Sequence, residues 1–354
     1  LVGSEMCIRD SIRLFHKSFT DWLNDSKASA AFYAPQEDGI RSLAAACFKA
    51  FEQGTDEMDE YELANASRLL RSAGMKKEYE QITDSSEYTS ALKKLAKAYA
   101  DDRQHERAAE LYLEYARIFK EKCENSGDPD QAHEAVWGNI YACDALVDML
   151  DYLAAEVAAI AALKIAEKFA KKYPEDPNLQ RELCVSYERL GDIAEARNNY
   201  YAAEGYYAKA LEIRERLAKM FPGVPMLKDD LAVSLFKCGS CSADGKLSSE
   251  QKAMLRSAAA IWEELYKQTG YELYAERREI AQNRLNQCSE QGGKNMKQKK
   301  PGFFAQLREK IRAYREMRML IRMFEIMEKT DRKLTKVIEE ADELVQSGET
   351  DDEE

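Results

Sequence analysis

The sequence predicts an all-α fold: an α-solenoid of stacked helix pairs, with a small helical region before it and an amphipathic helix after it. Residues that favour helices dominate the composition, and only 16 glycines and 7 prolines interrupt the 354 residues. A pattern of small and bulky residues recurs at a fixed step of 48 residues. Each copy carries two apolar stripes at helical spacing, and such stripes are buried only when neighbouring copies stack.

The recurrence is clearest between residues 161–177 and 209–225, where identical residues are separated by 48 positions. The same step carries Gly191 to Gly239, and the whole period extends over residues 131–272. Three copies of one pattern indicate a repeat architecture in which each unit packs on the next. The identical pairs include Ala162 and Ala210, Leu163 and Leu211, Ile165 and Ile213, Ala170 and Ala218, Pro174 and Pro222, and Pro177 and Pro225.

The middle copy predicts two amphipathic helices, over about 178–197 and about 200–220. Gly191 is small at a point where a partner helix must approach closely. Pro222 ends the second helix, because proline lacks the backbone N–H and clashes with the preceding turn. The apolar stripes consist of Leu183, Tyr187 and Leu190 in the first helix and of Ala203, Tyr207 and Ala210 in the second.

This order of small and large side chains resembles the tetratricopeptide repeat. A further copy is recognisable over 95–119, whereas the copy before the middle one has Cys143 in place of the glycine. The period is longer than the usual unit of about 34 residues, and closer to the long repeats of kinesin-light-chain-like proteins. The resemblance implies a protein-binding solenoid over 86–287. The positions that carry it are Leu190, Gly191, Ala203, Tyr207 and Ala210.

The N-terminal part has a different character. Residues 14–25 and 61–82 resemble the winged-helix and helical stretch that follows the nucleotide-binding module of STAND-type, NACHT-like NTPases. The resemblance implies that 11–85 is a helical, winged-helix-like remnant of such a module. The alternative is an irregular helical cap on the repeats. Residues 1–10 resemble a translated adapter sequence, and we expect them to be non-native.

The composition changes again after the repeats. We predict a polar, basic linker at 288–302, an amphipathic or coiled-coil helix at 303–346 and an acidic tail at 347–354. Heptad spacing between 317 and 345 favours self-association or docking on the repeats. Because the first half of this helix is basic, an anionic membrane surface is the alternative. The apolar positions are Met317, Leu320, Phe324, Met327, Leu334, Ile338, Ala341 and Val345.

The composition argues against two classes of partner. The formal net charge is -12, whereas nucleic-acid binding requires cations that displace counterions from phosphates. No apolar run approaches the length of about 18 residues that a transmembrane helix needs, so we expect no membrane span. No signal peptide is recognisable, and the 8 cysteines are expected to be reduced thiols in the cytoplasm.

No arrangement of residues typical of catalysis is recognisable, and we expect a non-catalytic protein without cofactor or metal site. Cys238 and Cys241 form a Cys-x-x-Cys pair, but at the C-terminal end of a predicted helix, where packing is favoured over redox chemistry. The loop 239–247 lacks the glycine spacing of a phosphate loop and has Leu247 where Ser or Thr is required. No nucleophile with its base accompanies the histidines, which are His16, His105 and His133.

In such solenoids the first helix of each pair lines a groove that holds a peptide or a helix. The acids among the groove candidates favour a basic partner, unlike the Lys and Asn with which chaperone-binding relatives clamp a carboxylate. The sequence therefore predicts a protein-interaction scaffold, by resemblance the C-terminal sensor part of a STAND-type signalling ATPase. The alternatives are the regulatory region of a larger fused enzyme and a stand-alone oligomerising adaptor. The groove candidates are Trp137, Ile140, Asp144, Glu188, Asp192, Glu195, Phe236 and Ser240.

Overall fold

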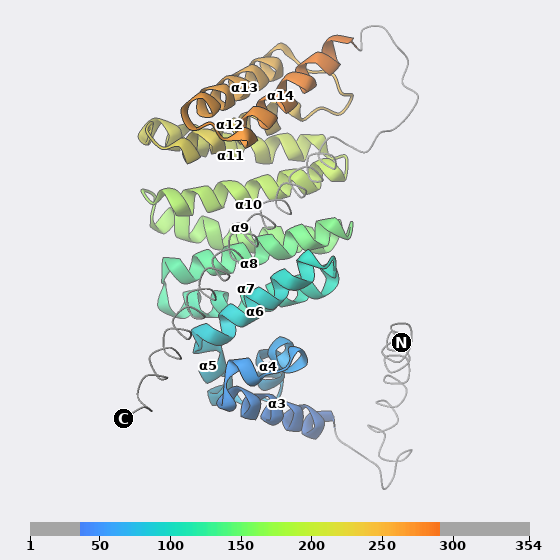
Figure 1. The fold of residues 1–354 in the computed structure, drawn as a ribbon, viewed down its shortest axis with the longest axis vertical. Helices are drawn as coiled ribbons and strands as arrows, with labels where there is room; N and C mark the ends of the chain where they lie inside the picture. The colour runs from blue at the N-terminus through green and yellow to red at the C-terminus, as the bar shows by residue number, and fades with distance from the viewer. Residues whose placement is uncertain (1–35, 291–354) are drawn as a thin grey trace, which may run out of the picture. The chain divides into compact units, whose positions relative to one another are not determined.

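The computed structural model describes residues 36–290, which form twelve α-helices and one short 3-10 helix and contain no strand (Figure 1). The predicted all-α solenoid is confirmed, because the helices pack in consecutive pairs. Within 36–290, no helix is long and apolar enough to cross a membrane. The predictions that lie outside the described residues concern 1–10, the stretch 14–25, the linker beyond Glu290, the helix at 303–346 and the tail at 347–354.

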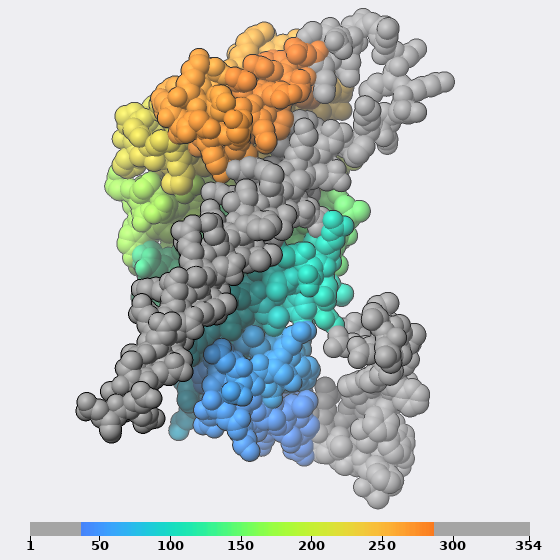
Figure 2. Space-filling model, in the orientation of Figure 1, coloured from blue at the N-terminus to red at the C-terminus, as the bar shows by residue number. Residues whose placement is uncertain are grey.

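Each helix contacts the next one along the chain, and Figure 2 shows this succession as bands of colour from the N-terminal to the C-terminal helices. The second helices of the pairs are α7, α9, α11 and α13, and the first helices are α6, α8, α10 and α12. The elements are α3 (Gln36–Gln53), η2 (Thr55–Glu57), α4 (Glu60–Ser72), α5 (Lys76–Asp84), α6 (Ser86–Asp101), α7 (His105–Ser126), α8 (Pro129–Asp148), α9 (Tyr152–Lys172), α10 (Pro177–Ala196), α11 (Tyr200–Met220), α12 (Pro225–Ser240), α13 (Ser249–Thr269) and α14 (Glu272–Glu290).

Local capping explains where the helices of the middle pair begin. Asp176 precedes α10 and accepts a hydrogen bond from the backbone N–H of Asn178, while Pro177 occupies the first helical position, where no N–H is needed. Asn199 caps α11 in the same way by accepting from the N–H of Ala202. The helices predicted over about 178–197 and 200–220 are therefore α10 and α11.

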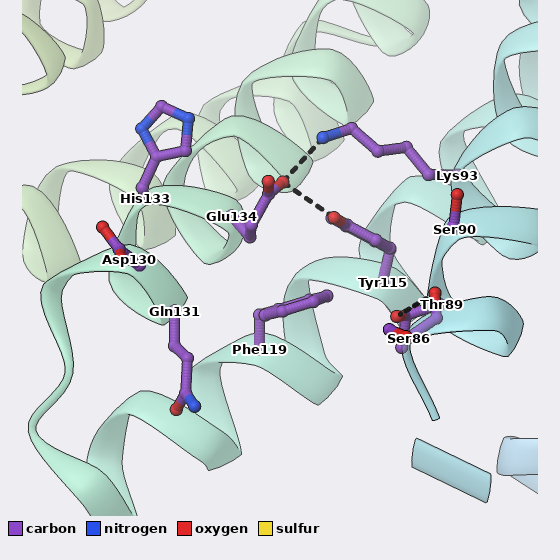
Figure 3. A pocket seen from close by; sticks show the side chains of 10 residues that line it. All are labelled: Ser86, Thr89, Ser90, Lys93, Tyr115, Phe119, Asp130, Gln131, His133 and Glu134. Carbon is purple, nitrogen blue, oxygen red and sulfur yellow. Dashed lines mark hydrogen bonds and ion pairs between the residues drawn. The ribbon is translucent and has the colours of Figure 1, made fainter. Parts of the chain in front are cut away.

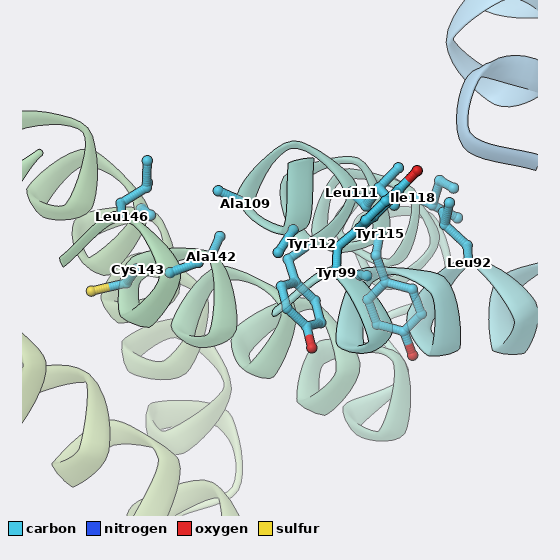
Figure 4. Packing of buried hydrophobic residues seen from close by; sticks show 14 of the residues in the cluster. Leu92, Tyr99, Ala109, Leu111, Tyr112, Tyr115, Ile118, Ala142, Cys143 and Leu146 are labelled. Atoms are coloured by element: carbon cyan, nitrogen blue, oxygen red, sulfur yellow. The ribbon is translucent and has the colours of Figure 1, made fainter. Parts of the chain in front are cut away.

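Small residues let the paired helices approach closely. A Cβ atom on Gly191 of α10 would lie 2.6 Å from Cδ1 of Tyr207 in α11, so only glycine fits at this contact. Gly239 of α12 is similarly close to Leu255 of α13. The pair α8 and α9 has Cys143 at the equivalent position, and its side chain is fully buried. Figure 4 shows this thiol within the cluster to which α6, α7 and α8 contribute.

The N-terminal helices share the core of the repeats. Leu70 of α4 and Ile82 of α5 are fully buried, and both belong to the cluster that also contains Tyr99 and Tyr112. Tyr88 of α6 anchors this junction, because its hydroxyl donates to the backbone carbonyl of Leu63. Helices α3–α5 are thus packed continuously on the first repeat pair.

Candidate functional site

Two adjoining hollows lie on the first helices α6, α8 and α10. The hollow between α6 and α8 has a volume of about 530 Å³, and its lining side chains are drawn in Figure 3. The hollow between α8 and α10 has a volume of about 360 Å³. Asp130 and His133 of α8 line both, so the two hollows meet at the N-terminal half of this helix.

Aromatic side chains follow α8 along this face. His133, Trp137 and Tyr141 are four residues apart, which places them on one side of the helix. The ring centroids of His133 and Trp137 are 6.2 Å apart, and those of Trp137 and Tyr141 are 5.6 Å apart. Phe119 of α7 adds a further ring to the hollow beside α6. The face therefore offers apolar, planar surfaces between its charged groups.

A ladder of ion pairs joins each first helix to the next one, and we call it the outer ladder. In three rungs a basic residue of one first helix pairs with an acid of the next, and in the fourth Arg277 of α14 pairs with an acid of α12, so every rung crosses between two neighbouring units. The rungs are Lys93 Nζ to Glu134 Oε2 at 2.6 Å, His133 Nδ1 to Glu182 Oε1 at 2.5 Å, Arg181 Nε to Asp230 Oδ2 at 2.5 Å, and Arg277 Nη1 to Asp229 Oδ1 at 2.5 Å.

The outer ladder was missed by sequence reasoning, although the sequence carries its signal. Glu134 and Glu182 are separated by 48 residues, the period of the repeat, and so are His133 and Arg181. A basic residue immediately before an acidic one thus occurs in two successive copies, whereas the next copy has Asp229 and Asp230 at these positions. Since the acid of one copy pairs with a basic residue of the preceding copy in the first three rungs, the recurrence indicates an inter-repeat ladder, whereas the rung from Arg277 to Asp229 runs in the opposite direction.

A second ladder neutralises two of the acids that were predicted to line the groove. Asp144 of α8 lies 2.7 Å from Arg189 of α10. Asp192 of α10 lies 2.6 Å from Lys237 of α12. These carboxylates hold successive repeats together, and the pKa of Asp192 is lowered by Lys237 and Arg189 against the opposing effect of burial.

Four other groove candidates are buried between helices. Ile140 is 0% exposed and Phe236 is 4% exposed, so both are core residues. Glu188 accepts a hydrogen bond from Ser234 Oγ at 2.8 Å and forms an ion pair with Arg214 at 3.3 Å. Both contacts are buried. Ser240 is also buried. Of the eight candidates, Trp137 is the one that lines either of these two hollows.

Glu195 has an unusual environment at the end of α10. The phenol oxygen of Tyr207 lies 2.8 Å from Asp192 Oδ1 and 3.0 Å from Glu195 Oε2. A phenol carries one proton, so it cannot donate to both carboxylates. Burial raises the pKa of Glu195 to about 7, and in its protonated form Glu195 donates to Tyr207 while Tyr207 donates to Asp192.

His133 is the titratable group at the meeting point of the hollows. Its hydrogen bond with Glu182 raises its pKa above the usual value, while partial burial acts in the opposite direction. The second carboxylate oxygen of Glu182, Oε2, is buried and has no hydrogen-bond partner among the described residues. The charge of this part of the face therefore depends on the protonation of one histidine.

Comparison with known proteins does not identify a family. No family model matches the chain, and no curated protein matches it. The solved structure of BtubC (BKLC) from P. vanneervenii is 15% identical, covers 74% of this chain and 96% of its own, and has a TM-score of 0.29. The de novo designed helical repeat protein DHR64 is 18% identical over 72% of this chain and 95% of its own, with a TM-score of 0.17. At these TM-scores the similarity carries no functional information.

Proposed function

We propose that the chain is a non-catalytic protein-interaction scaffold of the tetratricopeptide kind, which holds a segment of a partner protein across α6, α8 and α10. The observation that carries the proposal is the pair of adjoining hollows with Trp137 and Phe119 in their walls. Concave surfaces with aromatic walls bind extended segments well, because rings supply contact area with little loss of side-chain entropy. The outer ladder keeps the three helices in register beneath the ligand.

The charges of the hollows favour a partner segment with basic side chains. Two permanent cations, Lys93 and Arg181, stand against four carboxylates. Glu134 is paired with Lys93, Glu182 with His133, and Arg181 with Asp230 outside the hollows, so Asp130 and Asp176 supply the excess of negative charge. Complementary charge speeds encounter and rejects partners of the wrong sign. The carboxylates are those of Asp130, Glu134, Asp176 and Glu182.

Selection from a phage-displayed random peptide library on the full chain tests the proposal. Peptides enriched in Arg or Lys next to an aromatic or aliphatic residue are expected. Trp137→Ala should weaken their binding by about tenfold or more, because a central aromatic contact of this kind contributes over 1 kcal/mol. Tyr61→Ala, which removes an exposed ring on α4, is the matched control and should leave the dissociation constant unchanged.

A charge reversal gives the second arm of the experiment. Asp130→Lys at the junction of the hollows should weaken the binding of basic peptides. The affinity of the variant for these peptides should also fall less with rising salt concentration than the affinity of the parent protein does. Asp102→Lys, on the exposed α6–α7 connection, is the control. Enrichment of acidic peptides, or binding that is indifferent to both Trp137→Ala and Asp130→Lys, would contradict the proposal.

We also propose that the scaffold serves a larger signalling protein of the STAND type. The resemblance of residues 61–82 supports it, and α4 and α5, which these residues form for the most part, pack directly on the first repeat pair. The gene sequence upstream of the chain tests this context: a domain with a Walker motif is expected, whereas a protease or hydrolase domain there would instead make the chain the regulatory region of an enzyme. Self-association through 317–345 remains a separate prediction.

A further inference from the structure

The first half of helix α9 carries three large aliphatic side chains on the outside, whereas Leu163 and Ile165 further along pack inward. Leu153 is 68% exposed, Val157 is 69% exposed and Ile160 is 36% exposed. Leu150, in the turn immediately before the helix, is 70% exposed. The side of α9 that faces its neighbours is built largely from alanines, namely Ala155, Ala158, Ala159, Ala162 and Ala166, all of them buried.

This distribution is the reverse of what a helix at the surface of a folded chain normally shows. Large aliphatic residues gain most from burial, and a helix that is apolar on all sides is usually covered on all sides. Single exposed aliphatic residues are ordinary, but three on one side of a helix, with a fourth in the turn before it, mark an interaction surface. The exposed side of α9 is therefore suited to pack against another helix.

The spacing of the row is that of a coiled-coil seam. Leu150, Leu153, Val157 and Ile160 follow each other at steps of three, four and three residues, and we call them the α9 seam. Leu153, Val157 and Ile160 lie in the helix itself, and residues at such steps meet a partner helix as knobs that insert into holes. The seam is continued at the next step of four by Lys164, where the apolar character ends.

Opposite charges flank the two ends of the α9 seam. Asp148, which lies 3.8 Å from His105, and Asp151, which caps α9, are exposed before it, whereas Lys164 and Lys171 are exposed after it. The two glutamates between these ends already have partners: Glu156 pairs with Arg197, and Glu167 accepts a hydrogen bond from the hydroxyl of Tyr187. The seam is thus acidic at its beginning, apolar in its middle and basic at its end.

We propose that the α9 seam binds the α9 seam of a second copy of this chain, antiparallel and about a twofold axis. An axis midway between Leu153 and Val157 brings Leu150 of one copy to Ile160 of the other. The same operation brings Lys164 of each copy to the end where the other carries Asp148 and Asp151. A twofold interface must be self-complementary, and this charge order is self-complementary only in the antiparallel arrangement.

Sedimentation velocity of the full chain over a range of concentrations tests the proposal. A reversible dimer is expected, and Val157→Glu should weaken it by about tenfold or more, because it buries an unpaired charge at the centre of the seam. Met226→Glu, on an exposed methionine of α12, is the matched control and should leave the dimer unchanged. Circular dichroism confirms that each variant keeps its helices, as expected for exposed positions.

A charge exchange tests the antiparallel arrangement. Lys164→Glu should weaken the dimer by placing like charges together, and Asp148→Lys combined with Lys164→Glu should restore it. A chain that stays monomeric at every concentration would overturn the proposal, and so would a dimer that survives Val157→Glu, since it would assemble elsewhere, for example through 317–345. A double variant no tighter than Lys164→Glu would overturn the antiparallel arrangement.

Discussion

Glu195 and Tyr207 form a contact in which the protonation of one carboxyl matters. Tyr207 is fully buried, and its hydroxyl is shared by Asp192 and Glu195. Lys237 and Arg189 keep Asp192 ionised, so the proton required by the arrangement resides on Glu195. Ionisation of Glu195 places two carboxylates around one phenol and removes a hydrogen bond.

The pKa of Glu195, raised to about 7 from 4.5, predicts how stability changes with pH. The native state holds this proton more tightly than the unfolded chain, so the associated stability is present below about pH 4.5 and is lost as the pH rises through about 7. Glu195→Gln stays neutral and should escape this loss. In urea unfolding, its free energy of unfolding relative to the parent protein should rise by on the order of 1–2 kcal/mol between about pH 5 and about pH 8.

Glu212→Gln, which changes an exposed glutamate on α11, is the control for that experiment. Its free energy of unfolding should follow that of the parent protein throughout the pH range. A Glu195→Gln profile parallel to the parent profile would show that the carboxyl is ionised in the native state at neutral pH.

At the scale of elements, the distance between paired helices depends on single small residues. Gly191 is in contact with the ring of Tyr207, whereas Gly205 of α11 has no heavy atom within 4 Å of the position a Cβ would take. Both glycines lie within helices, where alanine is intrinsically favoured. The two positions therefore separate the effect of helix packing from the effect of helix propensity.

Gly191→Ala should destabilise the protein by about 1–3 kcal/mol, because the added methyl group forces α10 and α11 apart. Gly205→Ala should stabilise it by about 0.5–1 kcal/mol, because it gains helix propensity without a clash. Midpoints of urea unfolding measure both. Equal effects of the two substitutions would mean that α10 and α11 are not in close contact at Gly191.

At the scale of the molecule, stability is local because the helices contact mainly their neighbours along the chain. The outer ladder adds contacts between first helices of successive pairs, but no described element bridges distant repeats. In such a chain the total stability is close to a sum of terms within pairs and between neighbouring pairs. Damage to a terminal pair should therefore leave distant pairs folded.

Leu255→Ala tests this locality, because Leu255 of α13 is fully buried against α12. The truncation should cost about 3–5 kcal/mol in the last pair. Hydrogen exchange should then accelerate in α12–α14 and stay slow in α6–α9. Uniform acceleration along the chain would show that the repeats unfold as one cooperative unit.

Local pattern was enough to predict the helices and their pairing. The 48-residue step, the small residue at Gly191 and the bulky residue at Tyr207 are properties of neighbouring turns of helix, and the structure places them in contact between α10 and α11. A helix repeats every 3.6 residues, so its apolar stripe can be identified without knowledge of its neighbours. Part of the outer ladder was visible in the same way, because a basic and an acidic residue recur together at 133–134 and 181–182.

Tertiary structure alone decided which face of each helix is open. Glu188 and Phe236 were placed in a groove by counting from an aligned glycine, yet both are buried. Arg214 of α11 and Ser234 of α12 contact Glu188, and Trp262 of α13 packs against Phe236. Asp144 and Asp192 are neutralised by cations about one period further along the chain. The exposed α9 seam was hidden for the opposite reason: large aliphatic residues suggest a core, and only packing shows that alanines took the inner positions.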